Sequence, residues 1–171
     1  VFRDGKLVGW LDQYQTRGYL FVADKVGNPV ISFSAPESKI SIEIIQSTGK
    51  KSVIFKNGEP ARLSVQIRLE GNIGEYIGKE MLSKPEDIHK IEKMLSEEVK
   101  KEINMALNKA QKDYSSDIFG FGEYVHKYYP KYWKKAMDEW NDVFSRLPAD
   151  IRVEAKIRHT GLIKSPMKKD E

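Results

Sequence analysis

Apolar and polar residues alternate with a period of two through much of the stretch 30–73. The first alternating run places Ile40, Ile42 and Ile44 on one face. A later run places four more apolar residues on one face: Leu63, Val65, Ile67 and Leu69. Successive side chains of a strand point to opposite faces of a sheet, so this pattern is typical of strands with one buried and one solvated face. The stretch is therefore predicted to form an antiparallel meander.

Turn signals divide this stretch into strands. Asn57-Gly58 is the strongest short signal for a hairpin turn. The polar sequence Ser47–Lys50 is also interpreted as an interruption, after which a separate strand begins at Val53. Residues 150–159 alternate again and predict a final strand that returns to the sheet, with these residues on its apolar face: Ile151, Val153, Ala155 and Ile157.

Residues 83–114 are predicted to form one long helix. Ser83 and Glu86 have the spacing of a capping box, and Pro85 falls in the first turn, where its missing N–H group costs nothing. A single apolar stripe follows at steps of three and four: Ile88, Ile91, Leu95, Val99, Ile103, Ala106 and Ala110. The opposite, solvated side is assigned to Glu97, Glu98, Lys100, Lys101 and Glu102. Such a helix fits across the apolar face of the sheet. The alternative is a coiled coil with a partner, although the repeat is only moderately regular.

Residues 117–145 predict two shorter helices separated at Pro130, which cannot continue the first helix but can open the second. The second helix is predicted to carry four residues on one face: Trp133, Met137, Trp140 and Phe144. Residues 1–22 fit either a strand followed by a helical turn or a short helix with Gly18 as its C-cap. Together these elements predict an α+β fold, in which an antiparallel sheet of about four strands packs against a long helix and two shorter aromatic-rich helices.

The composition is that of an ordinary globular protein. The chain has 171 residues and a net charge of +4, with both signs interspersed, which argues against a nucleic-acid-binding stripe. It contains no cysteine, so disulfides and thiol catalysis are excluded within these residues. No apolar run approaches the roughly 18 residues needed to span a bilayer. We expect a piece of a longer protein, with one domain over residues 1–163 and a polar tail over 164–171.

The motifs do not assemble a catalytic or metal site. Glu123 and His126 have the i, i+3 spacing used by di-iron bundles, but only one copy is present. Gly120-Phe121-Gly122 does not continue as a phosphate or dinucleotide loop, so loop geometry or close helix packing explains it better. We therefore predict a protein that is not an enzyme, with no cofactor, no metal ion and no nucleic acid as a partner.

The aromatic-rich segment 116–133 is the strongest candidate for a functional surface, and lysines 127, 131, 134 and 135 are interleaved with its end. The rings can pack inward while the lysines extend outward, or form a membrane or partner surface, or stack on single-stranded nucleic acid. Core packing is favoured, yet the rings exceed what one helix face buries, so part is predicted to be exposed. The predicted interaction surface is either the exposed part of the region 119–133 or the loop around Arg17. Its candidate residues are Arg17, Phe119, Phe121, Lys127, Tyr128, Lys131, Tyr132 and Trp133.

A series of short motifs spans nearly the whole chain. In order they are Asp4–Leu11, Thr16–Gly18, Ile40–Ile44, Glu70–Glu75, Ala110–Glu123, Tyr129-Pro130, Trp133, Trp140, Phe144 and Ile157–Ile163. This ordered set resembles the C-terminal domain of the C subunit of bacterial spore germinant receptors, the Ger(x)C family of spore germination lipoproteins. Each motif alone is weak, whereas the ordered set is specific.

The resemblance implies a non-enzymatic subunit that acts with an A subunit and an integral-membrane B subunit in nutrient-triggered germination. It implies a location on the outer face of the spore inner membrane, held by a lipid anchor such as palmitate that lies outside these residues. It also implies an antiparallel sheet flanked by helices. The residues alone leave one alternative function, a peripheral membrane-surface module that uses the face Lys127–Lys135.

Overall fold

The computed structural model describes residues 1–3, 5–35, 38–78 and 84–160. Its elements in chain order are β1 (Phe2–Arg3), β2 (Lys6–Leu7), α1 (Gln13–Val22), β3 (Val30–Ala35), β4 (Ser38–Lys56), β5 (Glu59–Gly78), α2 (Pro85–Asn108), a π-helical turn η1 (Lys109–Asp113), α3 (Phe121–Tyr128), α4 (Pro130–Ala136), a 3-10 turn η2 (Met137–Glu139), α5 (Trp140–Arg146) and β6 (Ala149–Thr160). The predicted tail 164–171 and Ser83 of the predicted capping box lie outside the described residues.

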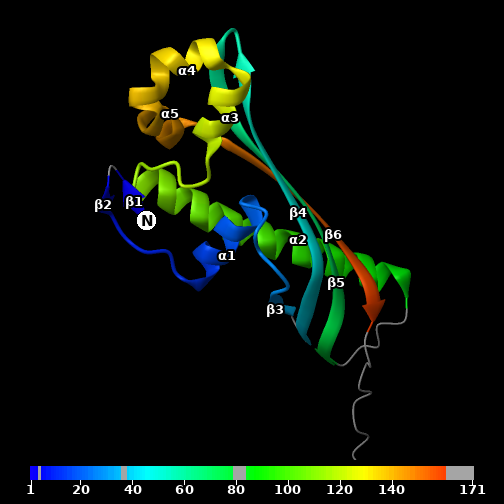
Figure 1. Ribbon diagram of the computed structural model, residues 1–171. Helices are drawn as coiled ribbons and strands as arrows, with labels where there is room; N and C mark the ends of the chain where they lie inside the picture. Colours follow the sequence, from blue (N-terminus) through cyan, green and yellow to red (C-terminus); the bar gives the residue numbers. More distant parts are fainter. Residues whose placement is uncertain (4, 36–37, 79–83, 161–171) are drawn as a thin grey trace, which may run out of the picture.

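Four strands form a twisted sheet in the order β3-β4-β5-β6, and α2 lies across one of its faces (Figure 1). The pairs β3/β4 and β4/β5 are antiparallel, whereas β5 and β6 run parallel from the Leu63–Ala149 pair onward. The predicted α+β fold is confirmed, but the sheet is mixed rather than wholly antiparallel. The reason is the connection from β5 to β6, which contains α2 and the helices after it, because parallel neighbours require such a crossover.

Strands β4 and β5 form one long hairpin of 19 and 20 residues. The predicted turn at Asn57-Gly58 is confirmed, and both residues have the positive φ of 54° and 83° that this kind of turn requires. The predicted interruption at Ser47–Lys50 is wrong, because β4 continues through it. Gly49 instead provides room for the end of α1: a Cβ there would lie 2.3 Å from the Phe21 carbonyl oxygen, and its N–H donates to Asp24 Oδ1 at 2.7 Å.

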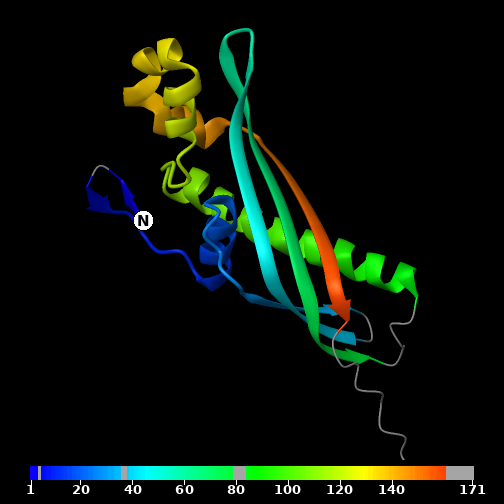
Figure 2. The ribbon, with the colours of Figure 1, turned by 45° about the vertical axis from the view of Figure 1, so that its right-hand side comes forward.

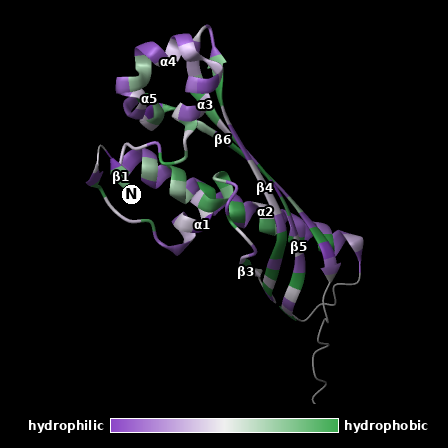
Figure 3. Ribbon diagram, in the orientation of Figure 1, coloured by the Kyte–Doolittle hydropathy of each residue, from purple (hydrophilic) through white to green (hydrophobic). Residues whose placement is uncertain are grey.

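The core lies between the sheet and α2. The predicted apolar faces of β5 and of α2 are buried together, which confirms both patterns. Figure 3 shows hydrophobic residues alternating with polar ones along the hairpin strands. Burying one such aliphatic side chain contributes about 1.5–3 kcal/mol, so the α2 stripe is a main source of stability. Glu102 is the exception: it was predicted to face solvent but is buried with 1% of its surface exposed.

Helix α1 packs on α2 at a glycine. The predicted short helix is present, with a capping box formed by Asp12 and Gln15, but Gly18 lies inside it and the C-cap is Ala23. A Cβ on Gly18 would lie 2.2 Å from the Glu102 carbonyl oxygen. The glycine therefore sets the close approach of the two helices rather than ending α1.

The outer edge of β6 is covered by side chains of α2. The backbone N–H of Ala155 donates to Ser96 Oγ at 3.2 Å, and that of Ile157 donates to Glu92 Oε1 at 3.1 Å. An uncovered edge strand presents unpaired N–H groups to other chains. Ser96 and Glu92 thus satisfy two of these groups within the molecule.

Replacing Gly18 with alanine is expected to lower the free energy of unfolding by about 1–3 kcal/mol. Alanine is normally preferred over glycine inside a helix by about 1 kcal/mol, but here the new Cβ would collide with the backbone of α2. Chemical denaturation measures the change. Gly74→Ala is the control, because its Cβ would meet only the Ser41 carbonyl oxygen at 3.7 Å. Unchanged or higher stability of Gly18→Ala would contradict the close crossing.

Glu92 is expected to make the stability depend on pH. Burial opposes its ionisation, but hydrogen bonds from His89, the Ile157 N–H and Lys156 outweigh burial and hold the pKa of Glu92 below its ordinary 4.5. A carboxyl group whose pKa is lowered by folding stabilises the fold above its unfolded pKa, and this stabilisation is lost as the pH falls through the folded value.

Glu92→Gln should therefore reduce stability most at neutral pH and flatten the loss of stability from about pH 5 to about pH 3. Denaturation curves across this range measure the slope. The exposed Glu97→Gln on the same helix is the control. If the free energy of unfolding of Glu92→Gln falls with pH as steeply as that of the unsubstituted protein, Glu92 is not the cause of the pH dependence.

Candidate interaction surface

Helices α3, α4 and α5 with η2 form an aromatic lobe, residues 121–146, at one end of the sheet beside the hairpin tip, residues 50–62 (Figures 1 and 2). Pro130 opens α4 as predicted. The predicted second helix is divided by η2, whose tighter turn changes the phase of the residues that follow. As a result Trp140 and Phe144 are buried while Met137 is exposed, so the predicted common face is wrong at Met137.

The lobe is attached to the core by buried polar side chains. The Gln111 Nε2 amide, in the π-helical turn, donates to the carbonyls of Phe144 at 2.7 Å and Leu147 at 2.8 Å. Buried polar groups are stable only when their hydrogen bonds are made. The amide of Gln111 therefore fixes the end of α5 to the end of the long helix.

Asp117 organises the start of α3. Its carboxylate accepts the N–H groups of Gly120 at 3.0 Å and Gly122 at 2.6 Å, and also the indole Nε1–H of Trp140 at 2.8 Å. Gly120 has a φ of 77°, and a Cβ on Gly122 would lie 2.8 Å from Trp140 Nε1. Loop geometry and close helix packing thus both explain the Gly120-Phe121-Gly122 sequence, as predicted.

Phe119 and Phe121 belong to the core rather than to a surface. They are 2% and 0% exposed, and their rings pack with Phe144 at centroid separations of 6.5 and 6.1 Å. Their placement in the predicted interaction surface is wrong. The physical reason is that the two rings pack on each other and on Phe144 in the core cluster.

The end of α3 and the start of α4 supply the exposed part of the segment. Tyr128 is 56% exposed, and Lys127 and Lys131 beside it are also exposed. The Lys127 ammonium lies 5.3 Å from the centre of the Tyr128 ring, within cation–π range. Tyr132 and Trp133 are half-buried. The structure therefore brings together five of the eight predicted surface residues.

An open groove of about 820 Å³ separates the hairpin tip from α4. Its wall on the hairpin side is Phe55, whose ring stacks on Tyr129 at 3.8 Å and meets Tyr132 edge-on at 5.3 Å. The other residues that line it are Gly58, Glu59, Tyr128, Pro130, Lys131, Lys135, Ala136, Glu139 and Val143. The groove is thus walled by aromatic rings and bordered by charged residues.

Burial raises the pKa of Tyr132, and the neighbouring Glu59 carboxylate raises it further. The hydroxyl group therefore keeps its proton at neutral pH and interacts with the Glu59 carboxylate. Burial likewise raises the pKa of Tyr124, whose ring lies 4.6 Å from that of Tyr128. Tyr132 in the groove and Tyr124 beside Tyr128 are thus both neutral phenols at neutral pH.

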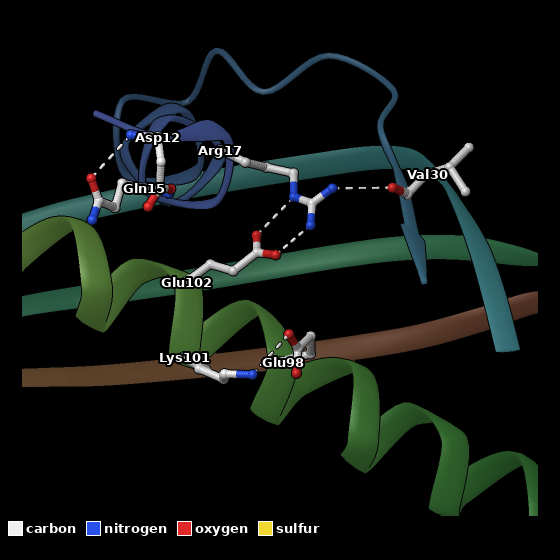
Figure 4. Close-up of polar contacts among 7 residues, drawn as sticks. All are labelled: Asp12, Gln15, Arg17, Val30, Glu98, Lys101 and Glu102. Carbon is white, nitrogen blue, oxygen red and sulfur yellow. Dashed lines mark hydrogen bonds and ion pairs between the residues drawn. The ribbon is translucent and has the colours of Figure 1, made fainter. Parts of the chain in front are cut away.

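Arg17 lies on α1, away from α4, and is occupied by an internal contact (Figure 4). Its Nε donates to Glu102 Oε2 at 2.8 Å, a second guanidinium nitrogen donates to Glu102 Oε1, and a third donates to the Val30 carbonyl at 3.1 Å. The hydrogen bond with Glu102 raises the pKa of Arg17 further. The structure therefore does not bring Arg17 together with the aromatic lobe: its side chain joins α1, α2 and β3.

Two features of the surface were not predicted from the sequence. Phe55 was assigned only to a strand, although its position next to the Asn57-Gly58 turn marks it as a residue of the hairpin tip. The second feature is a cluster of exposed apolar side chains near the N-terminus: Phe2, Leu7, Val8, Trp10 and Tyr14. Trp10 is 76% exposed while its carbonyl accepts a hydrogen bond from Tyr114 at 2.6 Å.

The described residues include no cluster of three or more His, Cys, Asp or Glu side chains that could hold a metal ion. His126 stacks on Trp133 at 5.7 Å instead. None of the helices in the described ranges combines the length and hydropathy needed to cross a membrane.

A family model described as spore germination B3/GerAC like, C-terminal, matches residues 1–161. The chain therefore belongs to this family of spore germination proteins, as the ordered motifs predict.

Curated relatives are consistent with this assignment. The chain is 30% identical over 167 residues to spore germination protein KC of Bacillus subtilis (strain 168), covering 96% of this chain and 40% of that protein. It is 28% identical over 162 residues to spore germination protein YndF of the same organism, covering 94% of this chain and 40% of that protein. The chain thus spans about two fifths of the length of these relatives.

A solved structure, the crystal structure of the GerBC protein, has the same fold. The TM-score is 0.78 at 22% sequence identity, and the match covers 90% of this chain and 48% of that chain. This likeness confirms the α+β architecture.

The Arg17–Glu102 pair is expected to be essential for stability. Arg17→Met leaves a buried carboxylate without its partner and should lower the free energy of unfolding by about 3–5 kcal/mol. The double variant Arg17→Met/Glu102→Met should recover most of this loss, because apolar replacements of a buried pair are often neutral. A double-mutant cycle by chemical denaturation measures the coupling.

The exposed Arg62→Met is the control and should change stability by less than about 0.5 kcal/mol. A loss in the double variant equal to the sum of the two single losses would show that the pair is not coupled.

Proposed function

We propose that this chain is the C-terminal domain of the C subunit of a nutrient germinant receptor and that it acts through protein–protein contacts rather than catalysis. The family match over residues 1–161 supports a role in spore germination. In this proposal residues 1–163 form one domain. The full protein is held at the outer face of the spore inner membrane by a lipid anchor, such as palmitate, outside these residues, and its partners are the A and B subunits of the receptor.

The observation that carries the proposal is the exposed ring surface on the aromatic lobe. Tyr128 leaves more than half of its surface in solvent at the edge of an apolar groove, although its ring also packs on that of Tyr124 at 4.6 Å. Exposed apolar patches rimmed by polar residues mark interaction sites, and tyrosine is among the residues that dominate binding energy at interfaces.

A co-purification experiment tests the proposal. The full-length subunit carrying Tyr128→Asp is expressed in the spore-former that encodes this chain, and receptor complexes are recovered from detergent-extracted spore membranes. The unsubstituted subunit is expected to retain the A and B subunits, and Tyr128→Asp should reduce their recovery by about tenfold or more. Nutrient-triggered germination should slow in parallel, while germination by a stimulus that bypasses the receptor stays unchanged.

Ile77→Asp is the matched control, because Ile77 is 57% exposed but lies at the opposite end of β5 from the hairpin tip. It should leave recovery and germination unchanged. The contradicting outcome is a Tyr128→Asp protein that is folded, as judged by circular dichroism, in spores that germinate normally and yield both subunits in full. The lobe would then not be the contact surface.

A further inference from the structure

We propose that the groove between the hairpin tip and α4 binds an acidic segment of a protein partner, with an apolar or aromatic side chain inserted between Phe55 and Tyr128. The proposal rests on the proposed function, because it specifies the chemistry of the partner at the same surface.

The shape of the groove favours an inserted side chain. Its volume of about 820 Å³ lies in the range of sites that enclose a ligand, roughly 300–1,000 Å³. The rings that wall it are held by one another, since Phe55 stacks on Tyr129 and meets Tyr132 at its edge. A preformed hollow of rings loses little conformational freedom on binding, which favours affinity.

The same geometry argues against a flat membrane as the occupant. Trp133 is the residue best suited to a lipid headgroup region, but it is half-buried and packs on Trp140 at 5.9 Å and on His126 at 5.7 Å. The apolar rings line a hollow rather than a convex face, and a bilayer surface does not enter a hollow. A protein segment does.

The charge around the groove selects an acidic partner. The hairpin tip and the aromatic lobe together hold nine basic and five acidic residues, a net charge of +4, whereas the rest of the chain has a net charge of zero. Some lysines elsewhere pair with carboxylates, as in Lys101–Glu98 and Lys109–Asp113. In the part of the chain that the structure describes, lysines 127, 131, 134 and 135 have no carboxylate partner.

The acidic residues near the groove do not cancel this charge. Glu59 interacts with the Tyr132 hydroxyl, and Glu139 lies beyond the end of α4, in η2. Lys131 and Lys135 are one helical turn apart on α4, so they flank the groove on one side. Acidic residues on either side of an inserted apolar residue would meet both lysines.

Selection of displayed peptides tests the proposal on the whole chain. A random library of peptides of about 12 residues is panned against the unsubstituted protein and, in parallel, against Ala136→Met, which fills the groove without changing charge. The selection is expected to enrich peptides in which an aromatic or aliphatic residue is flanked by Asp or Glu. This enrichment should occur on the unsubstituted protein, whose groove is open, and not on Ala136→Met. The enriched peptide should bind about tenfold more weakly to Lys131→Glu/Lys135→Glu, and more weakly as salt rises.

The exposed Lys93→Glu on α2 is the charge control and should bind the peptide normally. Enrichment of basic or uncharged peptides, equal enrichment on Ala136→Met, or no enrichment would overturn the proposal. A further result would overturn it: binding to vesicles of phosphatidylglycerol and phosphatidylcholine but not to vesicles of pure phosphatidylcholine, with no peptide enriched. The occupant would then be an anionic membrane.

The two proposals fail in different ways. If Tyr128→Asp impairs germination but the selected peptides are not acidic, the lobe is a contact surface and only the chemistry of the partner is wrong. If acidic peptides bind in the groove while spores with Tyr128→Asp germinate normally, the groove binds such peptides but is not the contact through which the subunit acts in germination.

Discussion

The buried carboxylate of Glu102 is the constraint on which the arrangement of the N-terminal half depends. A charge removed from water must be paired and hydrogen-bonded, or it opposes folding by several kcal/mol. Arg17 meets this demand from α1 and at the same time holds the Val30 carbonyl of β3. One guanidinium group therefore fixes a helix and an edge strand to α2, and Gly18, the next residue of the chain, allows the backbones to approach closely enough for the pair to form.

The second half of the molecule is organised by hydrogen bonds between polar side chains and the backbone. Gln111 attaches the end of α5 to the turn that follows α2, and Asp117 holds the start of α3 against Trp140. The rings of this region lie in two groups. Phe119, Phe121 and Phe144 complete the core, while Tyr128, Tyr129 and Tyr132 face the hairpin tip. The motif that is densest in the sequence, Ala110–Glu123, is thus a structural junction. The surface that we assign to a partner comes after it.

The elements with a long regular pattern were predictable from the sequence. The apolar stripe of α2 and the alternation of β5 and β6 have periods that only one kind of secondary structure satisfies. The Asn57-Gly58 turn was predictable for the same local reason. The parallel direction of β6 was not, because alternation shows which face a strand buries but not which way it runs.

The candidate surface was predictable only in part, since exposure depends on contacts between distant residues. Tyr128 and Phe121 are both aromatic residues of one helical segment, yet Phe121 is buried against Phe144 of α5 while Tyr128 is exposed. Arg17 and Glu102 have the composition of surface residues and are 85 positions apart. No local pattern indicates that they pair. Phe55 likewise joins the groove through a hairpin whose full length was hidden by the polar stretch at Ser47–Lys50.

The coverage of β6 by Ser96 and Glu92 has a consequence for how this domain behaves at high local concentration. A sheet grows by adding strands at its open edges, and that is the first step of domain exchange and of fibril formation. Here two N–H groups on one edge are held by the domain's own long helix, and on the other edge Arg17 already holds the Val30 carbonyl of the six-residue strand β3. At these positions the backbone groups are already occupied, which disfavours edge-to-edge pairing between neighbouring copies.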